Sequence, residues 1–520
     1  MAKGGILRNT FTVGALTALS RVLGLVREML QARLIGAGVE QSAFTLAFAI
    51  PNMARKLFGE GALTAAFVPV FKGEVERGEI ESARRLARAV MTTVMLILLA
   101  AVTLAVIGLS AYLGLSEGLS DRAALTVRLV RILFPYMIFI CGAAFGMGVL
   151  NALGKFVEGA FMPSMLNVVW ISALAGLWLF PGLPLSARVT AVAWAILFGG
   201  FAQMAFLFRC MAKRGYSPWP SFSGLWGEKV RLVWRNTAIA ALGAGAVQIN
   251  YALDQLLAQL ASPWAAGVVG YAERLMDLPL GVIGVAFGTV LLPTFAGFFA
   301  KDDVESARGA MASSLGSMMF LMIPAAAGLA VLAPEITTVI YEGQAFDAEA
   351  TVRVSRALAV YALGLVFFGF QKTLVPWFQA QSDMRTPLRV SVATVILNAT
   401  LNVLSLVVLP VEWRHVGFAA STVVCAAVGC ALLAVLAHRR TGATGASRAL
   451  PLVLKAAVSA AAMAAALLAL KPHVAGLCDV VRLAVEVIAG AAAYGICALA
   501  LMRGAVRQVL SRKTRCQMQL

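Results

Sequence analysis

The 520-residue sequence has little charge: only 13% of its residues are charged, whereas 60% are hydrophobic. An ordinary soluble protein is about 25% charged and about 45–50% apolar. A water-soluble fold of this length has a large surface that polar groups must cover, and this composition does not supply enough of them. A soluble enzyme, a secreted module and a disordered tail are therefore excluded, and a membrane protein with many spans is predicted.

Histidines, cysteine pairs and nucleotide-binding loops are scarce or missing. The three histidines lie far apart near predicted helix ends, which leaves almost no material for a zinc site or a histidine-based catalytic triad. No GxGxxG or GxxxxGK[ST] loop is present, so an ATP-driven motor would have to be a separate subunit. The seven cysteines form no CxxC pair, and we interpret them as small hydrophobic residues in helices. We therefore predict a transporter and not an enzyme.

Long apolar runs occupy most of the chain. A bilayer core requires roughly 20 mostly apolar residues per helix. The runs are too long and continuous for the alternating pattern of an outer-membrane barrel, so the predicted fold class is an all-α polytopic membrane protein. About fourteen spans are predicted, near 10–35, 43–70, 89–115, 126–152, 160–181, 189–208, 237–260, 265–295, 310–334, 354–380, 388–411, 415–437, 452–470 and 481–502.

The net charge of +18 is explained mainly by topology. With the N-terminus placed inside, the inner segments hold 27 Lys and Arg residues and the outer segments hold six. Such an asymmetry indicates that both termini are cytoplasmic. The inner residues lie at the N-terminus and in 72–88, 155, 209–235, 301–308, 385–389, 439–455 and 503–515, and the outer ones are Arg122, Arg188, Arg353, Arg414, Lys471 and Arg482.

An internal repeat divides the chain. FVPVFKGEVERGEIESAR (67–84) aligns without gaps with LLPTFAGFFAKDDVESAR (291–308), with both prolines and both ESAR tetrapeptides in register. The match places span 2 over span 8, and two parallel lobes around a midplane site are a transporter architecture. The predicted domains are an N-lobe of spans 1–6 (1–215), a C-lobe of spans 7–12 (216–440), and spans 13–14 with a cytoplasmic tail (441–520).

Charged residues at membrane depth are the candidates for function, because burying them there is costly. In span 1, the i, i+3, i+7 spacing puts Arg21, Gly24 and Glu28 on one helix face, with Arg27 on an adjacent face. A purely structural network of ion pairs is the alternative for this cluster. Further members are Arg55 and Glu60 in span 2, and Glu273, Arg274 and Asp277 in span 8.

The excess of arginine in this cluster predicts an anionic substrate. Guanidinium groups recognise phosphate with two hydrogen bonds and stay charged when partly desolvated. The nearby carboxylates orient some of the arginines without neutralising all of them. A phosphate or pyrophosphate ligand is therefore favoured. Snorkelling towards the interface is the simpler interpretation for charged residues near span ends, namely Arg33, Lys56, Arg128, Arg131 and Arg356.

Asp254 in span 7 is a separate candidate. It is a lone carboxylate in AVQINYALDQLLAQL, where Gln248, Asn250, Gln255 and Gln259 supply amide groups. A carboxylate with amide oxygens is suited to binding Na⁺ or a proton. A structural carboxylate satisfied by hydrogen bonds explains the pattern equally well.

At these residues the sequence resembles the MurJ/MviN family of lipid II flippases, within the multidrug/oligosaccharidyl-lipid/polysaccharide exporter superfamily. The resemblance covers essentially the whole chain, and its most specific parts are SRVLGLVRE (20–28), IPNMARKLFGEGALTAAFVPVF (50–71) and YAERLMDLPLGVIGVAFGTVLLPTF (271–295). It implies two six-helix lobes around a cationic cavity and a groove at spans 13 and 14 for the undecaprenyl tail. It implies that Ser20, Arg21, Gly24, Arg27, Arg55 and Arg274 are needed for function, and that Glu60 and Glu273 match acidic positions.

The resemblance also implies a mechanism and a location. The expected activity is alternating-access transfer of lipid II from the cytoplasmic to the periplasmic leaflet of the bacterial inner membrane, with the lipid bilayer and other cell-wall synthesis proteins as partners. No cofactor is expected beyond Na⁺ or the membrane potential as a driving force, and Asp254 matches a span-7 carboxylate of sodium-binding relatives. One departure is Ser42, which stands where relatives can carry an aspartate, so an acidic gate contact at that position is in doubt.

Three alternatives remain at this point. A flippase for another polyprenyl-diphosphate oligosaccharide would share the diphosphate and therefore the arginines. A drug or cation antiporter of the same superfamily is disfavoured by the arginine-rich cluster. A membrane phosphatase would need a catalytic set of acids, serine or histidine, which the outlying histidines His415, His438 and His473 do not provide.

Overall fold

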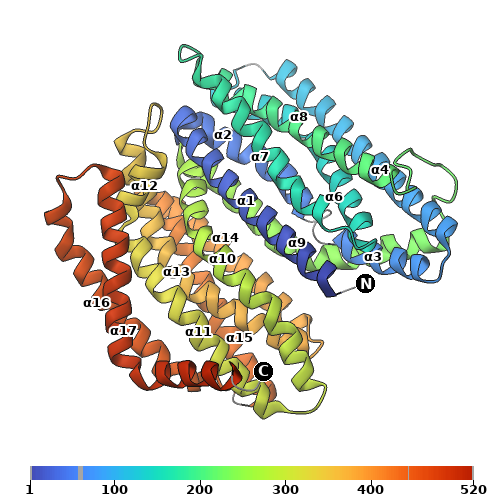
Figure 1. The fold of residues 1–520 in the computed structure, drawn as a ribbon. Coiled ribbons are helices and arrows are strands. Elements are labelled where there is room, and N and C mark those ends of the chain that lie inside the picture. The colour runs from blue at the N-terminus through green and yellow to red at the C-terminus, as the bar shows by residue number, and fades with distance from the viewer. Residues whose placement is uncertain (1–2, 57–61, 117, 443, 518–520) are drawn as a thin grey trace. The chain divides into compact units, whose positions relative to one another are not determined.

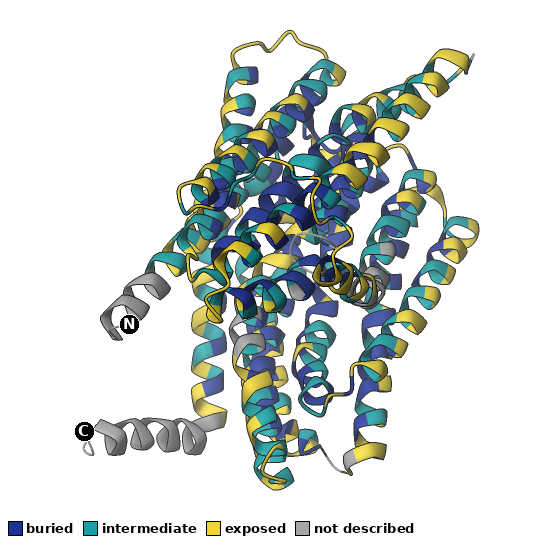
Figure 2. Ribbon diagram, turned by 90° about the vertical axis from the view of Figure 1, so that its right-hand side faces the viewer, coloured by how far each residue is buried: buried dark blue, intermediate teal, exposed yellow. Residues whose placement is uncertain are grey.

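The computed structural model describes residues 3–56, 62–116, 118–442 and 444–517. Within these residues all regular structure is helical (Figure 1). The chain forms two compact units: the first comprises residues 1–267 and 343–347, and the second comprises residues 268–342 and 348–520. In each, buried residues follow the packed faces of the helices and exposed residues lie on the opposite faces (Figure 2).

The first unit contains the first nine helices. In it α1 packs on α7, α6 on α8, and α9 on both α2 and α3. The helices are α1 (Lys3–Ile35), α2 (Val39–Ala54), α3 (Ala62–Glu76), α4 (Ile80–Leu115), α5 (Asp121–Leu133), α6 (Tyr136–Ala152), α7 (Val157–Trp178), α8 (Leu185–Ala212) and α9 (Glu228–Ala261).

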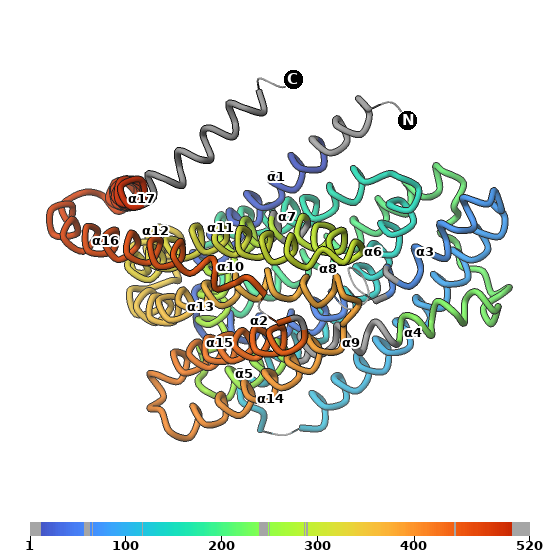
Figure 3. The backbone as a smooth tube through the Cα atoms, turned by 90° about the horizontal axis from the view of Figure 1, so that it is seen from below, coloured from blue at the N-terminus to red at the C-terminus, as the bar shows by residue number. Residues whose placement is uncertain are grey.

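The second unit contains the later helices, and α10 begins in the last residues of the first unit. In it α13 packs on α11 and α15, and the C-terminal pair α16 and α17 packs beside α11 and α12 (Figure 3). The elements are α10 (Ala265–Phe299), α11 (Val304–Val331), α12 (Ala333–Tyr341), α13 (Ala348–Ala380), α14 (Arg385–Val408), η2 (Val411–Trp413), α15 (Arg414–Thr441), η3 (Ala446–Ala449), α16 (Leu450–Val474) and α17 (Asp479–Gln517).

Every predicted span coincides with a helix, which confirms the all-helical membrane fold. Ten helical segments of the described chain are long and apolar enough to cross a membrane. Span 2 contains α2 and α3, with residues 57–61 outside the described chain. Span 4 is interrupted between α5 and α6 at Pro135, which has no N–H to continue the hydrogen-bond ladder. The short helix α12 was not predicted, because it follows span 9 directly. The lobe boundaries at 215 and 440 stay a prediction.

The duplication is visible in the backbone. After α3, Gly78 has a φ of +79°, its N–H bonds the Val75 carbonyl at 3.1 Å, and the Glu79 N–H bonds the Glu74 carbonyl at 3.0 Å. These bonds form a Schellman cap. After α10, 224 residues later, the same two bonds recur from Asp302 (3.2 Å) and Asp303 (3.0 Å), and Asp302 has a φ of +54°.

The arginines of the two ESAR segments occupy equivalent places. A Cβ at Gly215, just after α8, would stand 2.8 Å from Arg84 Nη2, and a Cβ at Gly442, just after α15, would stand 3.3 Å from Arg308 Nη2. Each arginine therefore lies against the glycine that ends the sixth or the twelfth span. This shared contact gives the repeated polar segment a structural role.

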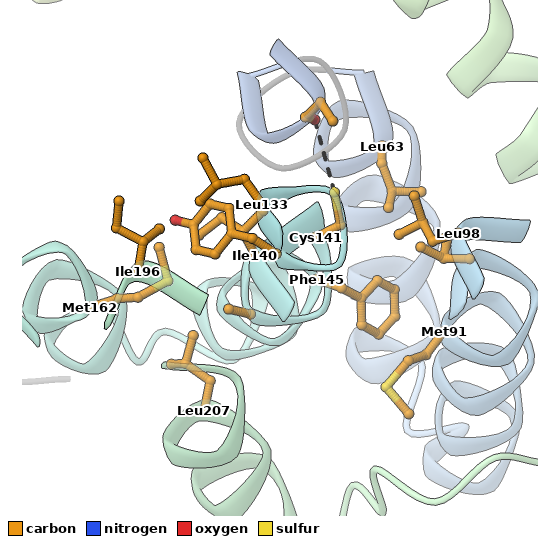
Figure 4. Close-up of a cluster of buried hydrophobic side chains, with 14 of the residues drawn as sticks. Leu63, Met91, Leu98, Leu133, Ile140, Cys141, Phe145, Met162, Ile196 and Leu207 are labelled. Carbon is orange, nitrogen blue, oxygen red and sulfur yellow. Dashed lines mark hydrogen bonds between the residues drawn. The ribbon is translucent and has the colours of Figure 1, made fainter. Parts of the chain in front are cut away.

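The core of the first unit packs closely around α6. Cys141 and Phe145 of α6 lie among buried side chains that include Leu133 and Ile196, and Cys141 Sγ is 3.9 Å from the Ala54 carbonyl (Figure 4). The helices approach so closely that a Cβ at Gly200 of α8 would stand 2.5 Å from two ring carbons of the buried Tyr136. Six of the seven cysteines, namely Cys141, Cys210, Cys425, Cys430, Cys478 and Cys497, are free, as expected of small hydrophobic residues.

Polar contacts attach the C-terminal helix pair, α16 and α17, to the other helices of the second unit. Lys471 Nζ of α16 lies 2.8 Å from Glu335 Oε1 of α12 and donates to the Val331 carbonyl at 2.8 Å. The Tyr494 hydroxyl of α17 donates to the Phe320 carbonyl of α11 at 2.7 Å. Because Glu335 is buried, its carboxylate depends on this lysine for compensation.

Candidate functional site

The predicted face of α1 meets α7 inside the first unit. Arg27 Nη1 donates to Asn167 Oδ1 at 2.9 Å, and Asn167 Nδ2 donates to the Ser20 carbonyl at 3.0 Å. A Cβ at Gly24 would be 3.8 Å from the same Asn167 amide nitrogen. Asn167 therefore joins three of the predicted residues, which lie on successive turns of α1.

The Arg27 guanidinium is held from several sides. It lies over the Trp170 ring at 4.4 Å from the centroid and forms an ion pair with Glu28. Trp170 in turn makes edge contacts with Phe44 and Phe48 of α2, at 5.7 and 5.6 Å between centroids. Arg27 Nε is buried without a hydrogen-bond partner. The guanidinium is thus fixed in place by Asn167, Trp170 and Glu28.

Arg55 and Lys56 follow α2 in a short π-helical turn. Arg55 donates to Asn52 Oδ1 from Nε at 3.2 Å and from Nη2 at 3.1 Å. Lys56 Nζ lies 5.2 Å from the centre of the Tyr251 ring of α9. The Asn52 amide therefore helps to position the Arg55 guanidinium. The predicted Glu60 lies outside the described residues.

The span-8 candidates lie in the second unit on α10. Arg274 and Asp277 are exposed, and Glu273 accepts a hydrogen bond from the Tyr361 hydroxyl of α13 at 3.3 Å. Tyr361 is buried, so it anchors Glu273 against the core of this unit.

Asp254 lies on α9 with its carboxylate mostly buried. The Asn250 amide nitrogen donates to Asp254 Oδ2 at 3.1 Å. The side-chain oxygens of Asn250 and Gln255 are buried without a hydrogen-bond donor. The segment thus places the Asn250 amide beside the carboxylate, and carboxylate and amide oxygens are the ligand atoms that hard cations prefer.

Ser42, the departure from the family pattern, is fully buried in α2. Its hydroxyl accepts a hydrogen bond from the Gly267 N–H at 2.9 Å, in the first turn of α10. This donor has no partner within its own helix, so Ser42 satisfies it as a cap would. A neutral hydroxyl suffices for this contact.

Glu74 at the end of α3 is a buried acid outside the predicted spans. Its carboxylate is fully buried and lies 2.6 Å from Lys229 Nζ of α9, with Arg77 bound to its other oxygen. The Lys229 and Ser82 hydrogen bonds lower the pKa of the Glu74 carboxyl from 4.5 to about 2. This group connects span 2 to span 7.

The sequence located the face of α1 but missed its partners on α7. Asn167 and Trp170 carry no charge and lie in an otherwise apolar run, so charge at membrane depth did not single them out. A buried asparagine in a membrane helix was the available signal, because such an amide must find hydrogen-bond partners. Of the residues assigned to snorkelling, Arg356 stacks on Trp413 at 4.7 Å.

Comparison with known proteins gives consistent matches. The family profile described as "Lipid II flippase MurJ" matches residues 31–487. A "Probable lipid II flippase MurJ" of Rhizobium tropici is 35% identical over 408 residues, covering 77% of this chain and 75% of that protein. The "Lipid II flippase MurJ" of Burkholderia cenocepacia is 33% identical over 407 residues, covering 76% and 78%.

Solved structures share the fold. "Lipid II flippase MurJ, inward closed conformation" superposes with a TM-score of 0.77 at 22% identity, covering 95% of this chain and 99% of that one. An inward-facing multidrug resistance transporter of the MATE family gives 0.66 at 15% identity, covering 84% and 98%.

Proposed function

Because the chain belongs to the lipid II flippase MurJ family, we propose that it moves lipid II, the undecaprenyl-pyrophosphate-linked peptidoglycan precursor, from the cytoplasmic to the periplasmic leaflet. The observation that carries this proposal is the family match over residues 31–487, with relatives more than 30% identical over three quarters of the chain. The substrate is a lipid with an anionic diphosphate headgroup, and the charged residues of α1 and α2 suit that chemistry.

The proposed headgroup-binding residues are Arg21, Arg27 and Arg55 in the first unit, and Arg274 is proposed as a headgroup-binding residue of the second unit. The arrangement of Arg27 supports this assignment, because a guanidinium stacked on an indole and bound by an amide is preorganised for a phosphate. The segment from Arg21 to Lys56 contains five basic and two acidic residues, and Glu28 forms an ion pair with Arg27. In this proposal Glu28, Glu60, Glu273 and Asp277 orient arginines or gate the site.

Ser20 and Gly24 would act through the backbone. The Ser20 carbonyl accepts a hydrogen bond from Asn167 and thereby holds the amide whose oxygen positions Arg27. A Cβ at Gly24 would stand 3.8 Å from the same amide nitrogen, so Gly24 leaves room beside it for a larger group.

The proposed cycle is alternating access. The headgroup enters from the cytoplasmic side, while the polyprenyl chain stays in lipid or in a groove at α16 and α17, because a polar cavity would forfeit its hydrophobic solvation. The membrane potential would reset the arginine-bearing helices, since moving one charge through 100 mV is worth about 2.3 kcal/mol. The proposed location is the bacterial inner membrane with both termini cytoplasmic, which the 27 inner against six outer basic residues support.

Sodium is proposed as a coupling ion at Asp254. The Asn250 oxygen, which is buried without a hydrogen-bond donor on the residue that contacts Asp254, suits a hard cation, which would neutralise the carboxylate when bound. We expect NaCl to raise the melting temperature of the purified wild type above its value in KCl, and Asp254→Asn to remove that difference. Equal melting in both salts would contradict sodium binding.

The flippase function is tested by depletion in cells. Loss of the protein is expected to accumulate lipid II and cause lysis, and accumulation of another lipid-linked oligosaccharide would overturn the substrate assignment. The headgroup site is tested by Arg27→Glu and Arg274→Glu, which are expected to abolish rescue while folded protein remains in the membrane. Arg85→Glu, at an exposed position on α4, is the matched control and should rescue.

A further inference from the structure

A hollow of about 1170 Å³ opens on the first unit, between the outer end of α4, α5 and the first half of α8. Its lining includes Ser110 of α4, Arg128 and Arg131 of α5, and Thr190 and Trp194 of α8. None of its lining residues is buried, so the hollow is open to its surroundings. Its volume is adequate for a small-molecule headgroup, because ligand pockets typically occupy about 300–1,000 Å³.

The two arginines of the hollow differ from the other arginines at this end of the unit. Arg122 donates to the Gln259 carbonyl, and Arg188 donates to three backbone carbonyls, so both have structural roles. Arg128 and Arg131 are exposed, and neither forms an ion pair with any carboxylate of the described chain. Glu117, which lies between two lining residues in sequence, is outside the described residues. Two guanidinium groups on one helix face thus line a hollow within a membrane-spanning segment.

The surroundings of the hollow are apolar and face outward. Leu104 and Ile107 of α4 and Phe198 of α8 are all more than 60% exposed, on helices apolar enough to span the membrane. Exposed apolar side chains on such helices contact acyl chains rather than water. Trp194 is also exposed, and tryptophan favours the boundary between acyl chains and headgroups. A ligand here therefore meets charge inside the hollow and lipid at its opening.

The depth of the arginines fits a lipid headgroup. Arg128 and Arg131 lie seven and ten residues after α5 begins at Asp121, which is roughly 10–15 Å along the helix. A phosphodiester drawn into the hollow would accept hydrogen bonds from both guanidinium groups and the Ser110 hydroxyl, while its acyl chains remain along α4 and α8. A free anion would gain nothing from the apolar surroundings.

We propose that this hollow binds the phosphate headgroup of an anionic phospholipid of the outer leaflet. The site is separate from the residues assigned to lipid II and does not depend on the flippase function. Its occupant bridges α4, α5 and α8, so binding stabilises the first unit.

The test uses the purified full-length protein with phosphatidylglycerol, phosphatidylcholine or inorganic phosphate, read by native mass spectrometry and thermal unfolding. We expect phosphatidylglycerol to bind and raise the melting temperature, and the other two to have little effect. Arg128→Gln with Arg131→Gln should weaken phosphatidylglycerol binding by roughly tenfold or more, because each charge-assisted hydrogen bond is lost. Arg85→Gln with Arg88→Gln, an i, i+3 pair on α4, is the matched control and should leave this stabilisation in place.

A second variant keeps the arginines and fills the space. Gly114 lines the hollow and has nothing within 4 Å of its Cβ position, so Gly114→Trp should fold and still block the headgroup. Equal phosphatidylglycerol binding by wild type and both sets of hollow variants would overturn the proposal. Stabilisation by inorganic phosphate to the same extent would show an anion site and overturn the assignment to a lipid.

Discussion

Asn167→Asp tests the electrostatics of the proposed headgroup site with almost no change of shape. The side chain lies 2.9 Å from Arg27 Nη1, so the substitution adds a carboxylate directly against that guanidinium, which already pairs with Glu28. At roughly 7 Å from a bound phosphate and an effective dielectric of about 20, the added charge costs about 2 kcal/mol for each phosphate charge. We therefore expect binding of a diphosphate lipid to weaken about 30-fold or more.

The assay pairs this variant with Asn167→Leu. Leucine removes both hydrogen bonds without adding charge, so stability should fall by about 1–3 kcal/mol while substrate binding falls less than in the aspartate variant. Binding of a fluorescent diphosphate lipid to purified protein and rescue of depleted cells provide the two measurements. Asn151→Asp, at the end of α6, is the control for an added charge elsewhere. Wild-type binding and rescue by Asn167→Asp would refute the role assigned to Arg27.

Three further predictions concern stability, measured as thermal unfolding in detergent. Gly200→Ala should destabilise the protein by about 1–2 kcal/mol, because overpacking against the Tyr136 ring outweighs the gain in helix propensity. Gly108→Ala, where nothing lies within 4 Å of the added Cβ, should stabilise the protein by up to about 1 kcal/mol. Equal effects of the two variants would contradict the close packing at Gly200. Lys471→Met should destabilise the protein by about 3–5 kcal/mol, because it leaves the Glu335 carboxylate buried without its cation. Combining it with Glu335→Gln, which removes the unpaired charge, should recover part of the lost stability. Because the folded-state pKa of Glu74 lies below its unfolded value, the contribution of this carboxylate to the free energy of unfolding is present above about pH 4.5 and is lost as the pH falls towards 2. The wild type should therefore be more stable than Glu74→Gln above about pH 4.5, and this difference in stability should disappear as the pH falls towards 2.

The sequence specified the helices more completely than the site. Hydropathy located each span, and the prolines and ESAR segments revealed a duplication whose capping bonds recur in the backbone. The short helix α12 was not predicted because its nine residues directly follow a long span and have no hydropathy pattern that separates them from it. Asn167 was not predicted for a different reason. Its contacts with α1 join residues 140 or more positions apart, and local sequence spacing does not indicate which helices pack together.

Ionisable groups in α1 were identifiable because charge in a membrane is rare. Which groups each charged side chain contacts depends on how the helices pack, and these contacts differ between arginines in the structure. Arg27 contacts an amide, an indole and Glu28, whereas Arg188, near the start of α8, donates only to backbone carbonyls. Residue type and membrane depth alone do not predict these two different sets of contacts.

The contact between Glu74 and Lys229 has a consequence for biosynthesis. The two residues are 155 positions apart, and a ribosome adding about 5–20 residues per second needs roughly 8–30 s to go from one to the other. During that interval α3 has been synthesised but α9 has not, so Arg77 and water or the insertion machinery must stabilise the carboxylate until Lys229 arrives. The first unit therefore finishes folding only after a helix from the second half of the duplication has arrived, and a pause in translation before Lys229 should prolong the period in which the nascent chain is open to proteolysis.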